Sequence, residues 1–212
     1  MRRPPLLVLT LLAVTTAVGG CSGASPAAPA PTSAASASPS ATARVNPGWE
    51  PKNATSGLTL ASTDFSAGGE FPASIELNSY GCNGKNVRPE LHWKGAPAGT
   101  KSFVVTFTAG GGGPLDRWMA FDIPTTVTAL PAAPGDAGPP AGKIGNTSVG
   151  GSAMLGPCSL EGQRWELWFT VYAMDTSLGL PAESTTTEVF EAGLGHVLAA
   201  AELNGYRTYQ GG

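Results

Sequence analysis

Short apolar stretches, separated by polar and turn-forming residues, run through the chain from about residue 57 onwards. Most have the length and alternation of β-strands rather than helices. Ser102–Thr108 and Glu166–Met174 are the richest in β-branched and aromatic residues, which is typical of buried strands. The pattern predicts strands at Leu58–Ser62, Ser74–Leu77, Glu90–Trp93, Ser102–Thr108, Trp118–Ile123 and Glu166–Met174. We therefore expect an all-β dominated domain.

One longer apolar segment near the C-terminus has helical periodicity. Thr185 and Glu188 have the spacing of a capping box, and Gly205 is a natural C-terminal stop. His196 would then lie within the helix, where we expect it to be partly exposed or hydrogen-bonded rather than catalytic. The residues that recur at steps of three and four are Val189, Phe190, Leu194, Val197, Leu198 and Ala201.

The N-terminus has the pattern of an export signal. Arg2 and Arg3 precede the apolar stretch Leu6–Val18, which is too short to span a bilayer, since a spanning helix needs about 20 residues. Val18-Gly19-Gly20-Cys21 follows and resembles the lipobox of bacterial lipoproteins. The resemblance implies cleavage before Cys21 and attachment of lipid, palmitate included, at that residue. The alternative is an ordinary secretory signal in which Cys21 has no special role.

The segment after Cys21 is made almost entirely of Ala, Ser, Pro, Thr and Gly. Such a composition buries too little apolar surface to offset the entropy lost on ordering. We predict a signal peptide at 1–20, a disordered lipid-anchored tether at 21–56 and one domain at 57–210. The tether would span roughly 30 Å and hold the domain at the extracytoplasmic face of a bacterial cell membrane.

Charge and cysteine content narrow the possibilities. Without Arg2 and Arg3 the chain has ten basic and fifteen acidic residues, a formal charge of −5, which argues against binding nucleic acid. With Cys21 lipidated, the two remaining cysteines and the two histidines include no close pair and do not form a zinc pattern, so no metal is expected. In an exported protein Cys82 and Cys158 are expected to form a disulfide worth roughly 4 kcal/mol. The alternative is two free, buried cysteines.

Motifs of catalysis and nucleotide binding are not found. There is no G-x-S-x-G nucleophile elbow, and the glycines Gly110–Gly113 lack the Lys-Ser/Thr of a phosphate-binding loop. We interpret these glycines as a flexible or tight loop, although they leave room for the close approach of an anion. Residues 125–152 are predicted to form a long loop. The chain is accordingly not expected to be an enzyme or to need a cofactor.

Five short motifs follow one another along the domain. They are CNGKNVRPELHW (82–93), GAPAGTKSF (95–103), WMAFDIP (118–124), GPC (156–158) and VYAMD (171–175). Their order resembles that of the phosphatidylethanolamine-binding protein family, in its bacterial Raf-kinase-inhibitor-like branch, and covers about residues 58–209. The resemblance implies a β-sandwich with a large central sheet, a smaller sheet and a C-terminal helix.

The resemblance also implies a pocket for phosphate-like anions, normally lined by an acidic loop, two histidines and a tyrosine. This chain departs from that lining: a glycine run stands where the acidic loop is expected, Arg117 replaces one histidine, and Trp165 and Leu167 stand near the other polar positions. The retained motif residues are Cys82, Asn83, Gly84, Asn86, Pro89, Trp93, Trp118, Gly156, Pro157 and Cys158. We therefore expect the inherited anion site to be lost or rebuilt.

Arginines are the candidates for new ligand donors, because guanidinium groups suit carboxylates and phosphates. The alternative is that they are solvated surface charges. The candidate pocket residues are Arg88, Pro89, Ala109, Gly110, Arg117, Trp118, Gly156, Pro157, Arg164 and Trp165.

The expected function is that of a membrane-anchored, non-enzymatic binding protein with a degenerate anion pocket. Its ligand would be a small anionic or apolar molecule, or a protein partner. The alternative is an inhibitor of a protease or other enzyme, acting through the 125–152 loop and the glycine run. A hydrolase is the third possibility, and no nucleophile–base set in the sequence supports it.

Overall fold

The computed structural model describes residues 46–52, 57–110 and 114–210. The chain divides into two units, Met1–Ser38 and Pro39–Gly212, and every described residue belongs to the second. The predicted signal, Cys21, most of the predicted tether and three glycines of the Gly110–Gly113 run lie outside the described residues. Among the described helices, none is long and apolar enough to cross a membrane.

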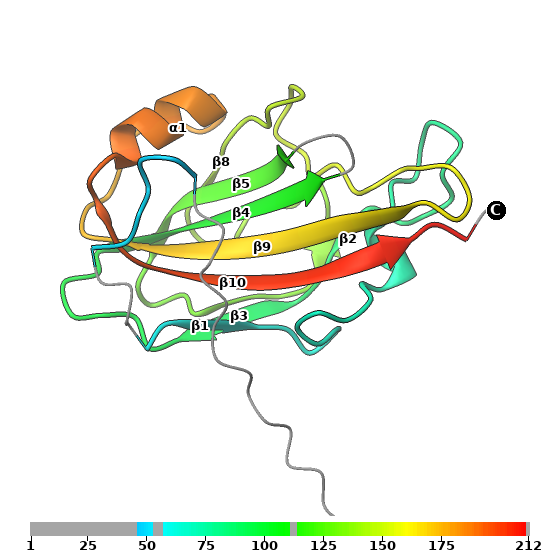
Figure 1. The fold of residues 1–212 in the computed structure, drawn as a ribbon. Coiled ribbons are helices and arrows are strands. Elements are labelled where there is room, and N and C mark those ends of the chain that lie inside the picture. The colour runs from blue at the N-terminus through cyan, green and yellow to red at the C-terminus, as the bar shows by residue number, and fades with distance from the viewer. Residues whose placement is uncertain (1–45, 53–56, 111–113, 211–212) are drawn as a thin grey trace, which may run out of the picture. The chain divides into compact units, whose positions relative to one another are not determined.

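Antiparallel strands form the framework of the domain (Figure 1). In chain order the elements are β1 (Thr59–Ala61), a 3₁₀ turn (Ala73–Ile75), β2 (Val87–Arg88), β3 (Leu91–Lys94), β4 (Ser102–Gly110), β5 (Pro114–Pro124), β6 (Ala129–Leu130), β7 (Ala133–Pro134), β8 (Lys143–Ile144), β9 (Arg164–Met174), α1 (Thr186–Gly193) and β10 (Val197–Thr208). The central sheet has the order β10-β9-β4-β5-β8, and smaller sheets are formed by β1-β3-β6 and by β2-β7.

The central sheet is covered on both faces, with β1 and β3 on one side and α1 on the other (Figure 1). On the first face, Phe103, Phe107 and Phe169 of the central sheet pack with Leu60 and Trp93 of the smaller sheet. The second face packs against α1 in a smaller apolar cluster. The all-β sandwich predicted from the sequence is confirmed, because strands of both sheets place apolar side chains in a shared core.

Five of the predicted strands are confirmed and correspond to β1, β3, β4, β5 and β9. The strand predicted at Ser74–Leu77 is wrong, since residues 73–75 form a 3₁₀ turn that buries Ile75. The long loop predicted at 125–152 contains three two-residue strands, β6, β7 and β8. Backbone hydrogen bonds hold this segment at several points: the N–H of Gly145 donates to the carbonyl of Met119, and the N–H of Ser148 donates to the carbonyl of Asp116.

The helix predicted to reach Gly205 is correct only in its first half. The capping box of Thr185 and Glu188 is present, but the helix ends at Gly193. Gly195 adopts a left-handed conformation with φ +71°, which turns the chain back, and β10 follows. Alternate residues of β10 are buried from Val197 onwards, so tertiary burial selects a period of two over the helical pattern. His196 lies between the two elements.

The domain includes residues of the predicted tether. Trp49 is fully buried against Tyr172 and Phe190, with ring centroids 4.8 Å away from each. Its indole N–H donates to the carbonyl of Phe190 at 2.8 Å, and Lys52 forms an ion pair with Asp175 at 2.7 Å. The predicted domain start at residue 57 is therefore too late. A single tryptophan in a polar segment carries no periodicity that would have revealed this contact.

Candidate functional site

Arg88 is buried and has no polar partner among the described residues. Arg88 is only 1% exposed. Its nitrogens Nε, Nη1 and Nη2 are all buried without a hydrogen-bond partner in the described part of the chain. The guanidinium carbon lies 5.0 Å from the centroid of the Trp118 ring. Burial lowers the pKa of Arg88 to about 10, so the side chain stays protonated at neutral pH. Arg88 is thus not the solvated surface charge that the sequence left open.

Backbone pairing directs Arg88 inward. Val87 and Arg88 form β2, which pairs with Ala133 and Pro134 of β7. Trp118 stands opposite Phe107 of β4, in the core between the sheets. The indole nitrogen of Trp118 is also buried without a partner among the described residues. Arg88 and Trp118 therefore place several N–H donors that have no partner among the described residues next to one another in the protein interior.

Arg117 directly precedes Trp118 and lies at an irregularity in the pairing of β4 with β5. Phe107 pairs with Trp118 and Thr108 with Asp116, so Arg117 is the extra residue of a bulge. Its guanidinium carbon lies 4.8 Å from the Trp165 ring centroid, and its Nε is buried without a partner in the described part of the chain. Burial lowers the pKa of Arg117. Among the described residues no carboxylate pairs with Arg88 or Arg117.

A groove of about 500 Å³ is lined in part by Trp165, the residue whose ring Arg117 contacts. Trp165 forms part of its wall, and its indole N–H donates to Ser159 Oγ at 2.9 Å. Two exposed apolar side chains also line it: Tyr80 is 90% exposed and Leu160 is 74% exposed. We call this the Trp165 groove; its lining is Tyr80, Gly81, Cys82, Cys158, Ser159, Leu160, Glu161, Gln163, Trp165 and Tyr209.

The retained motif residues build the frame around the groove. The side chain of Asn86 accepts from the Gly156 N–H at 2.9 Å and donates to the Met154 carbonyl at 2.8 Å. A Cβ atom at Gly156 would lie 1.9 Å from the Ile75 carbonyl oxygen, so only glycine fits there. Cys82 and Cys158 are joined by a disulfide with a Cα–Cα distance of 5.7 Å. These contacts hold two distant loops together at the groove.

The remaining predicted pocket residues do not form one cavity. Pro89, Ala109 and Pro157 are buried, and Gly110 ends β4 beside the Trp168 ring. Arg164 contacts different residues from Arg88 and Arg117. Its guanidinium carbon is 3.7 Å from the Tyr206 ring centroid, and its Nε donates to Glu166. Of the predicted pocket residues, only Trp165 lines the groove.

Sequence reasoning missed Tyr80, Leu160 and Tyr209. Apolar residues in a loop give no sign of whether they will be exposed, and these three meet only because the disulfide and β10 bring their segments together. The exposure of Tyr80 and Leu160 on one groove is unusual for large apolar side chains and indicates a contact surface.

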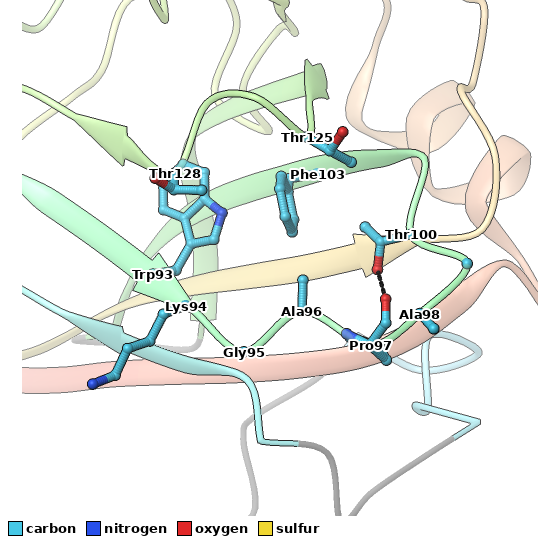
Figure 2. Close-up of a pocket in the computed structure, with 11 residues that line it drawn as sticks. Trp93, Lys94, Gly95, Ala96, Pro97, Ala98, Thr100, Phe103, Thr125 and Thr128 are labelled. Atoms are coloured by element: carbon cyan, nitrogen blue, oxygen red, sulfur yellow. Dashed lines mark hydrogen bonds between the residues drawn. The ribbon is translucent and has the colours of Figure 1, made fainter.

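A second, smaller pocket of about 320 Å³ lies between the 95–100 loop and residues 125–128. Figure 2 shows the indole of Trp93 beside the ring of Phe103, with its nitrogen on the side facing that ring. The two ring centroids are 5.4 Å apart and the rings are nearly perpendicular, at 70°. The buried indole N–H of Trp93, which has no hydrogen-bond partner in the described chain, is thus next to an aromatic face. None of the predicted site residues lines this pocket.

Comparison with known proteins agrees with this architecture. The chain is 32% identical over 152 residues to a UPF0098 protein of Methanothermobacter thermautotrophicus, which covers 70% of this chain and 97% of the relative. It is 31% identical over 155 residues to the UPF0098 protein YbcL of Escherichia coli, covering 68% and 81% respectively.

Solved structures give the same result. The crystal structure of Escherichia coli YbcL, described as a new member of the mammalian PEBP family, superposes with a TM-score of 0.65 at 27% identity, covering 72% of this chain and 99% of YbcL. A homolog from Chlamydia trachomatis at 24% identity and a TM-score of 0.60 shares the fold, over 70% of this chain and 95% of its own. The sequence model of the family described as "Phosphatidylethanolamine-binding protein" matches residues 61–209. This chain therefore belongs to the phosphatidylethanolamine-binding protein family.

Proposed function

We propose that this protein is a non-enzymatic binding protein, exported and held at the extracytoplasmic face of the cell membrane by lipid on Cys21. Its ligand is a small molecule that places an acidic group at Arg117 and an apolar or aromatic body in the Trp165 groove. The family's name, which describes binding proteins, supports the binding role. The basic, apolar and short N-terminal sequence that ends at Cys21 supports the anchor.

One observation carries the proposal: the guanidinium of Arg117 lies on the face of Trp165, which lines the groove. The Trp165 ring separates Arg117 from the groove. If the indole rotates, the Arg117 guanidinium can reach an acidic group of a ligand in the groove, and arginine can bind a carboxylate through two parallel hydrogen bonds. The exposed side chains of Tyr80 and Leu160 offer contact area for an apolar body. Mostly apolar walls with few polar groups are typical of ligand sites.

The experiment is a calorimetric titration of the full chain in detergent with benzoate, phosphate and phosphoethanolamine. Benzoate is expected to bind most tightly, because it alone combines an anion with an aromatic ring. Arg117→Gln should weaken its binding at least about tenfold, since a charged hydrogen bond is worth about 1.5–3 kcal/mol.

Arg164→Gln is the matched control. It removes an arginine that is also stacked on an aromatic ring, but whose contacts are with Tyr206 and Glu166, so affinity should not change. The proposal fails if phosphoethanolamine binds most tightly, or if the two variants weaken benzoate equally. If no small anion binds while a protein co-purifies with the detergent-solubilised chain, a partner-binding role replaces the small ligand.

A further inference from the structure

The 78–83 loop contributes to the wall of the Trp165 groove and is buried at a single point. Tyr80 and Cys82 of this loop line the groove. Cys82 is only 5% exposed, whereas the other residues of the loop are exposed. A disulfide joins Cys82 to Cys158, which also lines the groove. The loop is therefore anchored to the rest of the domain mainly through this bond.

Hydrogen bonds do little to hold the 78–83 loop in place. The N–H of Cys82 donates to the carbonyl of Ser79 at 3.0 Å, so this bond is internal to the loop. Apart from the contacts of Cys158 itself, the hydrogen bond that reaches the loop from elsewhere in the described chain runs from the Tyr209 hydroxyl to the Gly81 carbonyl, at 3.5 Å. A bond of that length is weak.

The backbone of the loop is also in an unfavourable conformation. Tyr80 has φ +57° and Gly81 has φ +86°. Glycine tolerates this left-handed region, but a residue with a bulky side chain rarely adopts it. Because Tyr80 is 90% exposed, packing of its own ring does not hold it there. The conformation of Tyr80 thus depends on a constraint elsewhere in the loop, and the disulfide at Cys82 provides one.

The base of the loop is held independently of the disulfide. The N–H of Leu77, a buried residue, donates to the carbonyl of Pro157 at 3.1 Å. The side chain of Asn86 accepts from the Gly156 N–H at 2.9 Å. Breaking the disulfide should therefore release the 78–83 loop while the rest of the domain stays folded.

We propose that the Cys82–Cys158 disulfide is a redox latch for the Trp165 groove. While the bond is closed, Tyr80 is kept in the groove wall and the groove holds its ligand. When the bond is reduced, the 78–83 loop opens and the affinity of the groove falls. This inference deepens the proposed function and rests on it, because it concerns the regulation of the same groove.

The reductant required is a dithiol. One of its thiolates attacks Sγ of Cys158, which is less buried than Cys82, so that a mixed disulfide forms and Cys82 leaves as a thiolate. The second thiol of the reductant then attacks the mixed disulfide and releases Cys158. Two electrons and two protons pass to the cysteines, and the reductant ends as an intramolecular disulfide.

The site of attack is tested with a monothiol, glutathione, added to the folded full chain in detergent. After a brief exposure, free thiols are blocked with N-ethylmaleimide and the peptides are identified by mass spectrometry. Glutathione on Cys158 and maleimide on Cys82 are expected. The reverse distribution, or exchange that occurs only after urea is added, would overturn the inference, because the bond would not be open to a reductant in the folded protein.

Hydrogen exchange measures the opening of the loop. Reduction of the folded chain with dithiothreitol should speed amide exchange within residues 79–83 at least about tenfold and leave β4 and β9 unchanged. Faster exchange over the whole domain would identify the disulfide as a purely structural cross-link. Unchanged exchange within residues 79–83 would show that other contacts hold the loop. Either result overturns the latch.

A benzoate titration separates the latch from the identity of the ligand. The oxidised chain is expected to bind benzoate at least about tenfold more tightly than the reduced chain, because an ordered wall lowers the entropic cost of binding. The double variant Cys82→Ala, Cys158→Ala should match the reduced chain. Equal affinities in both redox states, with the loop open after reduction, would overturn the latch and leave the groove ligand intact. Opening of the loop without benzoate binding in either state would count against the proposed groove function only.

Discussion

Gly193 and Trp49 are in such close contact that a Cβ atom at Gly193 would lie 2.2 Å from Cζ2 of the Trp49 indole. Gly193 is the last residue of α1, and Trp49 belongs to the segment 46–52 that enters the domain. The indole N–H of Trp49 also donates to the carbonyl of Phe190, which lies on the same helix. The end of α1 and the N-terminal segment are therefore packed as one unit.

Gly193→Ala should displace Trp49 from its site. The added methyl group clashes with a fully buried ring, and overpacking of this kind costs about 1–3 kcal/mol. We expect a lower free energy of urea unfolding and faster proteolysis within residues 46–52. Glu191→Ala, on the same helix, is the control and should change neither. A Gly193→Ala variant with wild-type stability and protease resistance would show that the contact is unimportant.

The disulfide between Cys82 and Cys158 should contribute substantially to stability. It joins two loops that both line the Trp165 groove. The double variant Cys82→Ser, Cys158→Ser is expected to lose about 2–4 kcal/mol of unfolding free energy in urea, because the unfolded chain is no longer cross-linked. Alkylation without reductant followed by mass spectrometry tests the bond itself. Wild-type protein that takes up label at both cysteines would contradict it.

Asp116 should make stability depend on pH. Burial raises the pKa of Asp116, although a hydrogen bond from Thr108 Oγ1 at 3.2 Å acts in the opposite direction. A raised folded-state pKa favours the protonated acid, so its stabilising contribution is present in acid and is lost as pH rises through the folded pKa. Asp116→Asn should therefore raise the unfolding free energy at pH 7 by about 0.5–2 kcal/mol.

The gain from Asp116→Asn should shrink towards zero below about pH 3.8, the ordinary pKa of the acid. Asp122→Asn is the control, and its effect on the unfolding free energy should have the opposite sign. Burial of Asp122 opposes ionisation, but hydrogen bonds from Lys143 and the Leu178 N–H outweigh it and lower the pKa. Its loss should destabilise the protein at neutral pH. Urea unfolding across pH 3–7 measures both, and a constant gain for Asp116→Asn over that range would contradict the assignment.

Cys21→Ser should release the protein from the membrane. In a lipoprotein this cysteine carries the lipid, and the described residues contain no helix that could span a bilayer. The variant is expected to lose incorporation of labelled palmitate and to move from the membrane pellet to the soluble fraction. Ser22→Ala is the neighbouring control and should keep both properties. An unlabelled wild-type chain would favour the ordinary secretory signal instead.

Local patterns predicted most of the sheet correctly but misassigned one long segment. Strands such as Ser102–Gly110 and Arg164–Met174 are recognisable because β-branched and aromatic residues are concentrated there. Val197–Ala201 satisfies a helical period as well as a strand period, because valine, leucine and alanine suit either. The segment forms a strand because it pairs with Ala173 and its neighbours on β9, which are distant in the sequence.

The candidate site was predictable in part. Arg117 was recognisable as a replacement of a family histidine, and Arg88 and Arg164 as candidate donors, but the environments of all three were not predictable. Arg88 lies in the core on Trp118 and Arg164 lies on the outer Tyr206 ring, although their sequence neighbourhoods are similarly mixed. Burial depends on which strand pairs with which, and the two-residue pairing of β2 with β7 leaves no sequence signature.

The amino-acid sequence by itself determined the export signal pattern, the strand-rich domain and the family frame, because these depend on composition, alternation and short motifs. Only the tertiary structure decided that Arg88 is sealed without a partner among the described residues, that Trp49 belongs to the core and that Tyr80 and Leu160 meet at Trp165. The physical reason is that exposure and pairing of a side chain are set by residues far away in the chain, which come together only when the sheets pack.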